Sequence, residues 1–359
     1  MRIRAALLAS ATAALVVPGT AAAHGPRVAL TRLGDAWRPA VPVLVVTVVL
    51  VILFARAFVR LRARGRTDHA GWPRALLFLA AVTTGTLALV SPLDAAGEQY
   101  LISAHMLQHV VIADAAPALA LAALRGPLLF FLLPSPLLAG LARIGALRAV
   151  LRLALRARVA VTIWIGTVAA WHVPVAYDAT LRHGWLHDLE HATLVLAGVL
   201  VWAQLIDPAR RRELTVARRF LVAFAVFVAG QALAYVLIFS LTPLYPSYAS
   251  QSTRLFGLSP LLDQQLAGVV MMVEQLLALG IWAALTLRRS GSRSAWSDQD
   301  ARALPAALAH RAVVTAPQRA AHPGLAANGM TDQGQRDAVE PLRVAAFEQD
   351  HIAGLDDLS

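Results

Sequence analysis

Long apolar runs alternate with short polar connections over most of this chain. Seven of the runs approach or exceed the roughly 20 apolar residues that a helix needs to cross a bilayer. They cover residues 41–59, 74–91, 100–124, 159–176, 186–206, 219–240 and 264–287. The pattern predicts an all-α protein, a polytopic membrane helix bundle with about seven transmembrane helices.

Two consecutive segments after the third run depart from this pattern. Residues 127–142 are apolar but too short for a span, and Pro134 and Pro136 interrupt them. Because proline breaks helices, we expect a re-entrant or surface segment there. From 143 to 156, arginines recur every four or five residues among leucine and alanine. This spacing predicts an amphipathic helix lying on a negatively charged membrane face.

The composition supports a membrane protein. Apolar residues make up 58% of the 359 residues and charged residues 15%, which leaves too few polar side chains to cover a soluble globule of this size. All 32 basic residues are arginine, and the formal net charge is +11. Because they cluster between the apolar runs, they favour a role in membrane orientation over nucleic-acid binding. The sequence has no cysteine, so histidine, methionine and carboxylates remain as metal ligands.

The distribution of arginine predicts the orientation of the bundle. Alternate connections are rich in arginine, namely residues 60–66, 125–158 and 210–219. The connections between them carry one arginine or none, namely residues 92–99, 177–185 and 241–263. Arginine-rich connections face the cytoplasm in most membrane proteins. We therefore expect the N-terminus outside and the C-terminus in the cytoplasm.

Both ends of the chain differ in composition from the predicted membrane domain, residues 24–287. Residues 1–23 combine Arg2 and Arg4 with an apolar stretch and a small-residue end, which is typical of a cleaved secretory signal peptide. A retained segment would add one more span. Residues 288–359 have few large apolar side chains, so we expect a disordered cytoplasmic tail.

Five histidines fall near the predicted outer ends of three spans. A spacing of four residues places His105 and His109 on one helix face, about 5–6 Å apart at their Cβ atoms. His187 and His191 form a second pair, and His172 lies on another span. A single membrane histidine is more often a packing residue, but repeated pairs favour a shared metal ion, because polar groups in lipid face one another. We expect all five to be metal ligands, with His172 as a fifth or alternating one.

Six further residues are candidates for supporting roles: Met106, Glu190, Asp94, Asp178, Asp263 and Glu274. Glu190 has the position of a carboxylate that orients a ligating imidazole. Glu274, about 15 Å into the last span, is either a deeper ligand or a proton-handling group. Asp94 and Asp263 alternatively cap helices, and Met106 alternatively belongs to the apolar core.

One local motif indicates a different chemistry. His187-Asp-Leu-Glu190-His191 fits the H-x-x-E-H pattern of inverted zinc peptidases, in which the glutamate is the general base. Patterns of five residues recur by chance, and a helical membrane bundle is a poor context for that fold. The sequence also shows no nucleophile and base pair and no phosphate-binding loop. We therefore predict that the protein is not an enzyme.

Six motifs follow one another between residues 75 and 287: Ser91-Pro-Leu-Asp94, His105-Met-Leu-Gln-His109, Trp171-His-Val-Pro174, Leu186–His191, Tyr245-Pro-Ser-Tyr-Ala249 and Leu258–Gly268. Together they resemble the CtaG family of caa3-type cytochrome c oxidase assembly factors, which are seven-span membrane proteins. The resemblance implies a multi-pass plasma-membrane protein that supplies or inserts copper at the catalytic subunit of a haem-copper oxidase. It implies an oxidase subunit as partner and leaves open whether a soluble copper chaperone loads the site.

The chemistry of the histidines alone leaves the metal and the role open. Imidazole suits zinc as well as copper, so the choice of copper comes from the resemblance. Histidines on facing helices also ligate haem iron, which makes a haem-binding or redox membrane protein the first alternative. The second is a metal-free assembly scaffold. A scaffold would tolerate replacement of His105 and His109 by alanine, whereas a metal carrier would lose bound metal and oxidase maturation.

Overall fold

The computed structural model describes the backbone of residues 28–314 and the side chains of residues 28–290. The predicted signal peptide, residues 1–23, and residues 315–359 of the predicted tail lie outside the described residues. Within residues 28–314 the chain forms helices joined by turns, without strands. The predicted all-α membrane bundle is confirmed.

Six helical segments of the described chain are long and apolar enough to cross a membrane. They are α2 (Val41–Ala63), α3 (Trp72–Val90), the segment Ile102–Ala123, α12 (Gly184–Ile206), α13 (Val216–Phe239) and the Pro260–Ser290 part of α15 (Pro260–Val314). A seventh span is formed if α9 (Gly145–Ala154) and α10 (Ala157–Trp171) count as one span, bent by 78°. The count agrees with the sequence, and the orientation across the membrane stays a prediction.

The span of α10 ends earlier than the predicted limit at residue 176. Pro174 has no backbone N–H, and a residue that precedes proline disfavours helical geometry. The helix therefore stops at Trp171, and a new short helix, α11 (Pro174–Arg182), begins at the proline. His172 consequently lies in the break between two helices.

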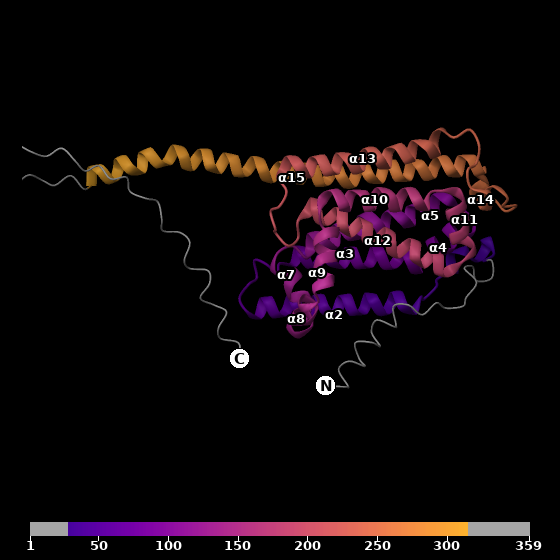
Figure 1. The fold of residues 1–359 in the computed structure, drawn as a ribbon, viewed down its shortest axis with the longest axis horizontal. Helices are drawn as coiled ribbons and strands as arrows, with labels where there is room; N and C mark the ends of the chain where they lie inside the picture. Colours follow the sequence, from indigo (N-terminus) through magenta and orange to yellow (C-terminus); the bar gives the residue numbers. More distant parts are fainter. Residues whose placement is uncertain (1–27, 315–359) are drawn as a thin grey trace, which may run out of the picture. The chain divides into compact units, whose positions relative to one another are not determined.

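Short helices gather at both ends of the bundle (Figure 1). At one end are α4 (Pro92–Gln99), α11 and α14 (Pro246–Ala249), and each starts with a proline, the residue favoured at the first helical position. At the other end are α7 (Pro127–Leu132), α8 (Ser135–Arg143) and α9. The predicted irregular segment 127–142 is thus a pair of short helices, and α8 has no buried residue. Two short 3₁₀ turns, η1 (Leu30–Asp35) and η3 (Leu255–Gly257), complete the described elements.

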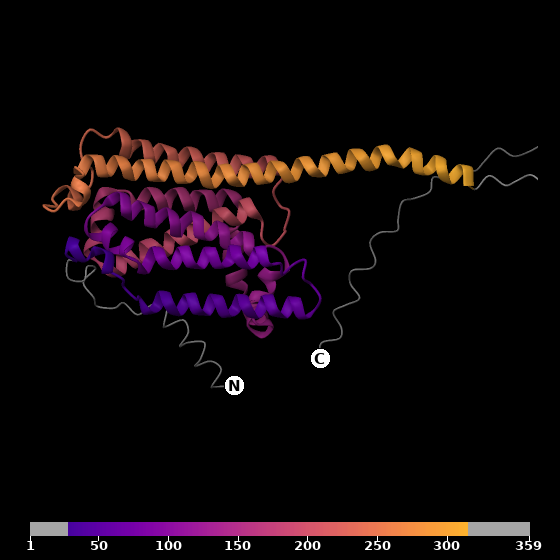
Figure 2. The same cartoon turned by 180° about the vertical axis from the view of Figure 1, so that it is seen from behind.

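Burial separates a central helix from a peripheral one. Half of the apolar window of α12 is buried, against 17% in α2, and α12 contacts α10, α11 and α13. In both views α2 lies on the opposite side of the bundle from α13 and α15 (Figures 1 and 2). Exposed apolar side chains of α2, such as Val45 and Ile52, suit contact with lipid chains. The candidate site includes residues of this central helix, α12.

The third span changes its helical geometry directly after its histidine pair. It consists of α5 (Ile102–Val110), a π-helical turn, η2 (Val111–Ala115), and α6 (Ala116–Ala123). Pro117 cannot donate to the carbonyl of Ala113 as a regular α-helix requires. On α12, a Cβ atom at Gly198 would overlap this same carbonyl. Glycine therefore lets α12 pack directly against the irregular turn, and such turns are frequent at functional sites.

The last helix is longer than the sequence suggests. The predicted span ends at residue 287, and a disordered tail is predicted from 288. In the structure α15 continues to Val314, so residues 288–314 of the predicted tail are helical. Alanine and arginine are frequent in this stretch and are good helix formers, although it lacks the apolar residues that signal a buried helix.

Candidate metal centre

Four histidines from α5 and α12 converge. One ring nitrogen of each of His105, His109, His187 and His191 lies within 4.8 Å of the others. The ring centroids are 4.3 Å apart within the α5 pair and 4.1 Å apart within the α12 pair. Across the two helices they are 5.3 Å and 5.2 Å apart. His105 therefore lies opposite His187, and His109 lies opposite His191.

These distances suit a shared metal ion. Metal–imidazole bonds of about 2.0–2.1 Å place ligand atoms about 3.3 Å apart in a tetrahedron and about 4.1 Å apart when they are opposite each other. The Nε2 atoms of His105 and His187 are 3.4 Å apart. Because the whole set lies within 4.8 Å, small ring rotations bring all four nitrogens to bonding distance.

The orientation of His105 is set by a tyrosine of α14. Nδ1 of His105 lies 3.1 Å from the hydroxyl of Tyr248, and this hydroxyl donates its proton to the carbonyl of Gly97 at 2.7 Å. Its oxygen is therefore the acceptor for the Nδ1–H of His105. Burial raises the pKa of Tyr248 well above its ordinary value, so the hydroxyl keeps its proton. This assignment leaves the Nε2 lone pair of His105 directed at the other histidines.

The orientation of His187 is set by a carboxylate of α4. Nδ1 of His187 lies 3.4 Å from Oε1 of Glu98, and Oε2 of Glu98 accepts a hydrogen bond from Arg38 at 2.9 Å. A carboxylate beside Nδ1 favours the tautomer that carries its proton there, which leaves Nε2 as the metal-binding atom. The lone pairs of His105 and His187 then oppose each other, an arrangement that a cation between them stabilises.

Buried polar atoms beside the rings of His105 and His187 lack hydrogen-bond partners. Among the described residues, both ring nitrogens of His109 and Nε2 of His191 are buried without one. Glu190 is fully buried, and its Oε1 lies 3.9 Å from Nε2 of His109, which is beyond hydrogen-bond distance. Unpaired buried polar groups are uncommon and costly. The residues therefore fit a bound cation better than an empty site.

Asp263 holds the start of α5 in place from α15. Its carboxylate accepts hydrogen bonds from the backbone N–H groups of Ile102, at 2.9 Å, and Ser103, at 3.1 Å. The N-cap residue of α5 itself, Leu101, provides no side-chain hydrogen bond. A carboxylate at a helix N-terminus satisfies free N–H groups and matches the helix dipole. Of the two predicted roles, Asp263 thus has the geometry of a cap, and it caps the helix that carries His105.

Three other candidates brace the surroundings of the cluster. Asp94 accepts a hydrogen bond from Gln108 at 2.8 Å, and Gln108 directly precedes His109 on α5. Asp178 accepts one from the backbone N–H of Ser247 at 3.4 Å, which connects α11 to α14. Met106 is buried in an apolar cluster with aromatic residues of α11 and α14. All three fix elements that hold the histidines.

The structure places two predicted candidates outside the four-histidine group. Nδ1 of His172 lies 2.8 Å from the carbonyl of Val168 on its own helix, and His172 is not among the four converging residues. Glu274 on α15 is also outside this group. Nε2 of His172 is buried without a hydrogen-bond partner, and the ligand roles of His172 and of the four converging histidines stay predictions.

Three residues that orient the cluster had no such role in the sequence-based predictions: Arg38, Glu98 and Tyr248. Arg38 and Glu98 are 60 positions apart in the sequence, and no local spacing connects them. Tyr248 belongs to the motif Tyr245-Pro-Ser-Tyr-Ala249, which carried the resemblance without a role for the hydroxyl. For Tyr248, the position of this motif between two spans was the signal in the sequence that could have indicated a role.

The fold and the site define a polytopic helical membrane protein with a buried histidine cluster between two of its spans. The chain belongs to the cytochrome c oxidase caa3 assembly factor family (Caa3_CtaG), whose model matches residues 52–291. The match covers about two thirds of the chain, including both histidine pairs. Comparisons with curated proteins and with solved structures give no match. Membership in this family implies a partner related to the oxidase and suggests a non-catalytic role.

Proposed function

We propose that this protein binds one copper ion through His105, His109, His187 and His191 and delivers it to the catalytic subunit of a haem-copper oxidase during assembly in the plasma membrane. Copper is cargo in this proposal and is not consumed in a reaction. The convergence of four ring nitrogens within 4.8 Å carries the proposal. Membership in an oxidase assembly family supplies the destination.

The charges around the cluster bear on the charge of the ion. Four neutral imidazoles add no negative charge, and a buried ion needs a counter-charge. Arg38 lies 2.9 Å from Glu98 and 3.9 Å from Asp94, and Glu190 is a third buried carboxylate, 3.9 Å from His109. Cu(I) needs less counter-charge than Zn(II) or Cu(II), and we propose Cu(I) as the transported form.

The burial of the cluster supports a carrier that protects its ion and still releases it. His105, His109 and His187 are buried, whereas His191 is partly exposed. Imidazoles without thiolates bind a soft ion such as Cu(I) less tightly than cysteine-rich sites do. Nε2 of His191 is buried, but His191 alone of the four has partly exposed side-chain surface, and we propose that transfer to a partner starts there.

Replacement of each histidine pair tests the proposed function in cells. We expect full-length His105→Ala/His109→Ala and His187→Ala/His191→Ala variants to accumulate normally in the membrane but to leave the oxidase without copper and inactive. His183→Ala is the matched control, because His183 is exposed and lies one turn before His187. Oxidase activity and copper content, measured at equal variant abundance, give the result. Normal oxidase maturation in both double variants would establish the scaffold alternative, and a Soret band in the purified protein would establish the haem alternative.

A further inference from the structure

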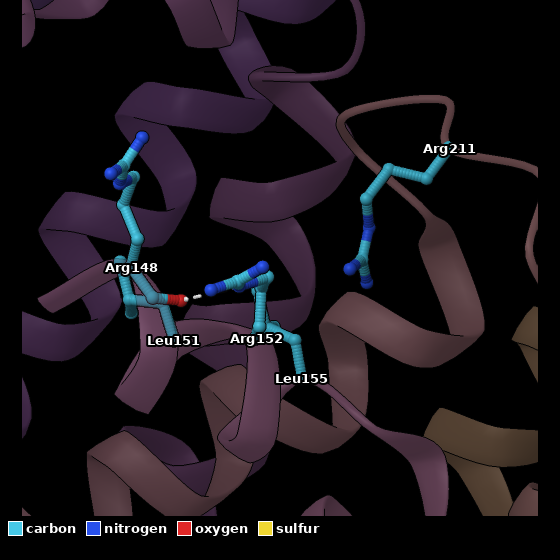
Figure 3. Close-up of a pocket in the computed structure, with 5 residues that line it drawn as sticks. All are labelled: Arg148, Leu151, Arg152, Leu155 and Arg211. Atoms are coloured by element: carbon cyan, nitrogen blue, oxygen red, sulfur yellow. Dashed lines mark hydrogen bonds between the residues drawn. The ribbon is translucent and has the colours of Figure 1, made fainter. Parts of the chain in front are cut away.

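A cleft at the other end of the bundle is lined by arginine and leucine. It has a volume of about 380 Å³ and lies between α9 and the loop that follows α12. Its lining residues are Arg148, Leu151, Arg152, Leu155 and Arg211. Figure 3 shows the first four on or beside α9, with the Arg211 side chain extending from the facing loop. No lining residue is acidic.

Positive charge in this cleft exceeds negative charge. Arg211 lies 3.2 Å from Glu213, and Nε of Arg152 donates to the backbone carbonyl of Arg148 at 3.3 Å. Three arginines thus line the cleft, and a carboxylate outside the lining pairs with one of them. Guanidinium groups bind phosphate through paired N–H donors with a fixed geometry. The cleft therefore has the chemistry of a phosphate site.

A further arginine lies close to the loop after α12: the N–H of Gly126 donates to Pro208 of that loop at 2.7 Å, which brings the preceding Arg125 beside it. Burial, followed by the nearby Arg289, Arg210 and Arg219, lowers the pKa of Arg125 below its ordinary value. Cations that repel one another in this way raise the local affinity for anions.

The position of α9 places the cleft at a membrane surface. The 78° bend directs α9 almost perpendicular to α10. No residue of α9 is buried, and Val150 and Leu153 are 62% and 52% exposed. An amphipathic helix with this exposure lies along the interface, with its apolar side chains among the acyl chains. In this arrangement the arginines of α9 would lie at the depth of lipid phosphate groups.

We propose that the cleft between α9 and the loop after α12 binds the phosphate group of an anionic membrane lipid, with Arg148, Arg152 and Arg211 as its ligands. Soluble phosphate shares this chemistry but has no acyl chains to cover the exposed apolar side chains of α9. The lipid is therefore the source that satisfies both parts of the surface. This site is separate from the histidine cluster and does not depend on its function.

Native mass spectrometry of the full-length protein, released from nanodiscs that contain phosphatidylglycerol and phosphatidylcholine in equal amounts, tests the proposal. We expect the wild type to retain phosphatidylglycerol about tenfold over phosphatidylcholine, and the Arg148→Gln/Arg152→Gln/Arg211→Gln variant to lose this preference. The matched control is Arg64→Gln/Arg66→Gln/Arg218→Gln, which removes the same charge at exposed positions outside the cleft and should keep the preference. A second arm adds inorganic phosphate at millimolar concentration to protein in phosphatidylcholine nanodiscs, where we expect no change in unfolding temperature.

Three results would each overturn the lipid site. The first is a wild type without preference for phosphatidylglycerol. The second is a control variant that loses as much preference as the cleft variant, which would indicate general charge attraction. The third is stabilisation of the wild type, but not of the cleft variant, by inorganic phosphate alone, which would assign the cleft to a soluble anion. Arg148→Lys/Arg152→Lys/Arg211→Lys keeps the charge and folds with the least change, so a partial loss in this variant supports recognition by paired guanidinium donors.

Discussion

The two ends of the bundle differ in how they use polar side chains. At the end formed by α4, α11 and α14, histidines are mostly buried, and neighbouring side chains orient His105 and His187. At the end formed by α7, α8 and α9, arginines such as Arg148 and Arg152 are exposed. A buried cluster selects a ligand by distance and angle, whereas exposed charges act at longer range and are screened by salt. The first end is therefore suited to one ion, and the second to a charged surface.

The largest expected effect comes from the ligands themselves. Replacing any one of His105, His109, His187 or His191 by alanine should lower the affinity for Cu(I) by more than 100-fold, which exceeds the effect of changing an orienting residue. His172→Ala should leave the affinity within a few-fold, because His172 is not among the four histidines whose ring nitrogens converge. Competition with a chromophoric Cu(I) chelator measures both. A comparable loss of affinity in His172→Ala would support the prediction that His172 is a fifth ligand.

A smaller effect should follow from changing the partners that orient the rings. Glu98→Gln and Tyr248→Phe should each weaken Cu(I) binding by about 10- to 100-fold without abolishing it, because second partners fix the tautomer and angle of a ligating imidazole. Asp188→Asn is a matched control, since Asp188 is exposed and adjacent to His187. The same chelator competition applies. Wild-type affinity in both variants would show that the contacts of Nδ1 do not set the site.

Close packing of α12 against η2 of the third span should contribute to the free energy of unfolding. A Cβ at Gly198 would overlap the carbonyl of Ala113, so Gly198→Ala should lower the free energy of unfolding by about 1–3 kcal/mol. Gly166→Ala on α10 is the control, because nothing lies within 4 Å of the added Cβ and alanine favours a helix over glycine. Thermal unfolding in detergent compares them. Equal unfolding temperatures for the two variants would mean that α12 does not pack closely against η2.

The smallest effect is a dependence of stability on pH. Burial, followed by the Glu98 carboxylate, raises the pKa of Asp94 to about 6. Because the folded state then binds the proton more tightly than the unfolded state, this stabilisation is present at about pH 4 and is lost as the pH rises through about 6. Asp94→Asn keeps an acceptor for Gln108 and removes the titration. Its unfolding temperature relative to wild type should therefore be higher at about pH 7.5 than at about pH 4.5, and a constant difference would contradict this assignment.

The sequence predicted the spans and the two histidine pairs because both are local signals. Apolar length indicates a membrane helix, and a spacing of four residues places His187 and His191 on one face. It did not predict that Tyr248, 143 positions from His105 in the chain, sets the orientation of that ring. Contacts of this kind depend on how α14 folds back over α4, which no spacing records. His172, predicted as a ligand, lies in the helix break before Pro174 and outside the group of four, and its ligand role stays a prediction.

X-ray absorption spectroscopy of the purified, copper-loaded protein, combined with its copper content, is the most direct test of the metal centre. The account predicts about one copper per chain, with a first shell of imidazole nitrogens at about 2.0 Å, and loss of both in His187→Ala/His191→Ala. Protein that binds no copper, or copper in a sulfur-containing shell that persists in the double variant, would contradict it.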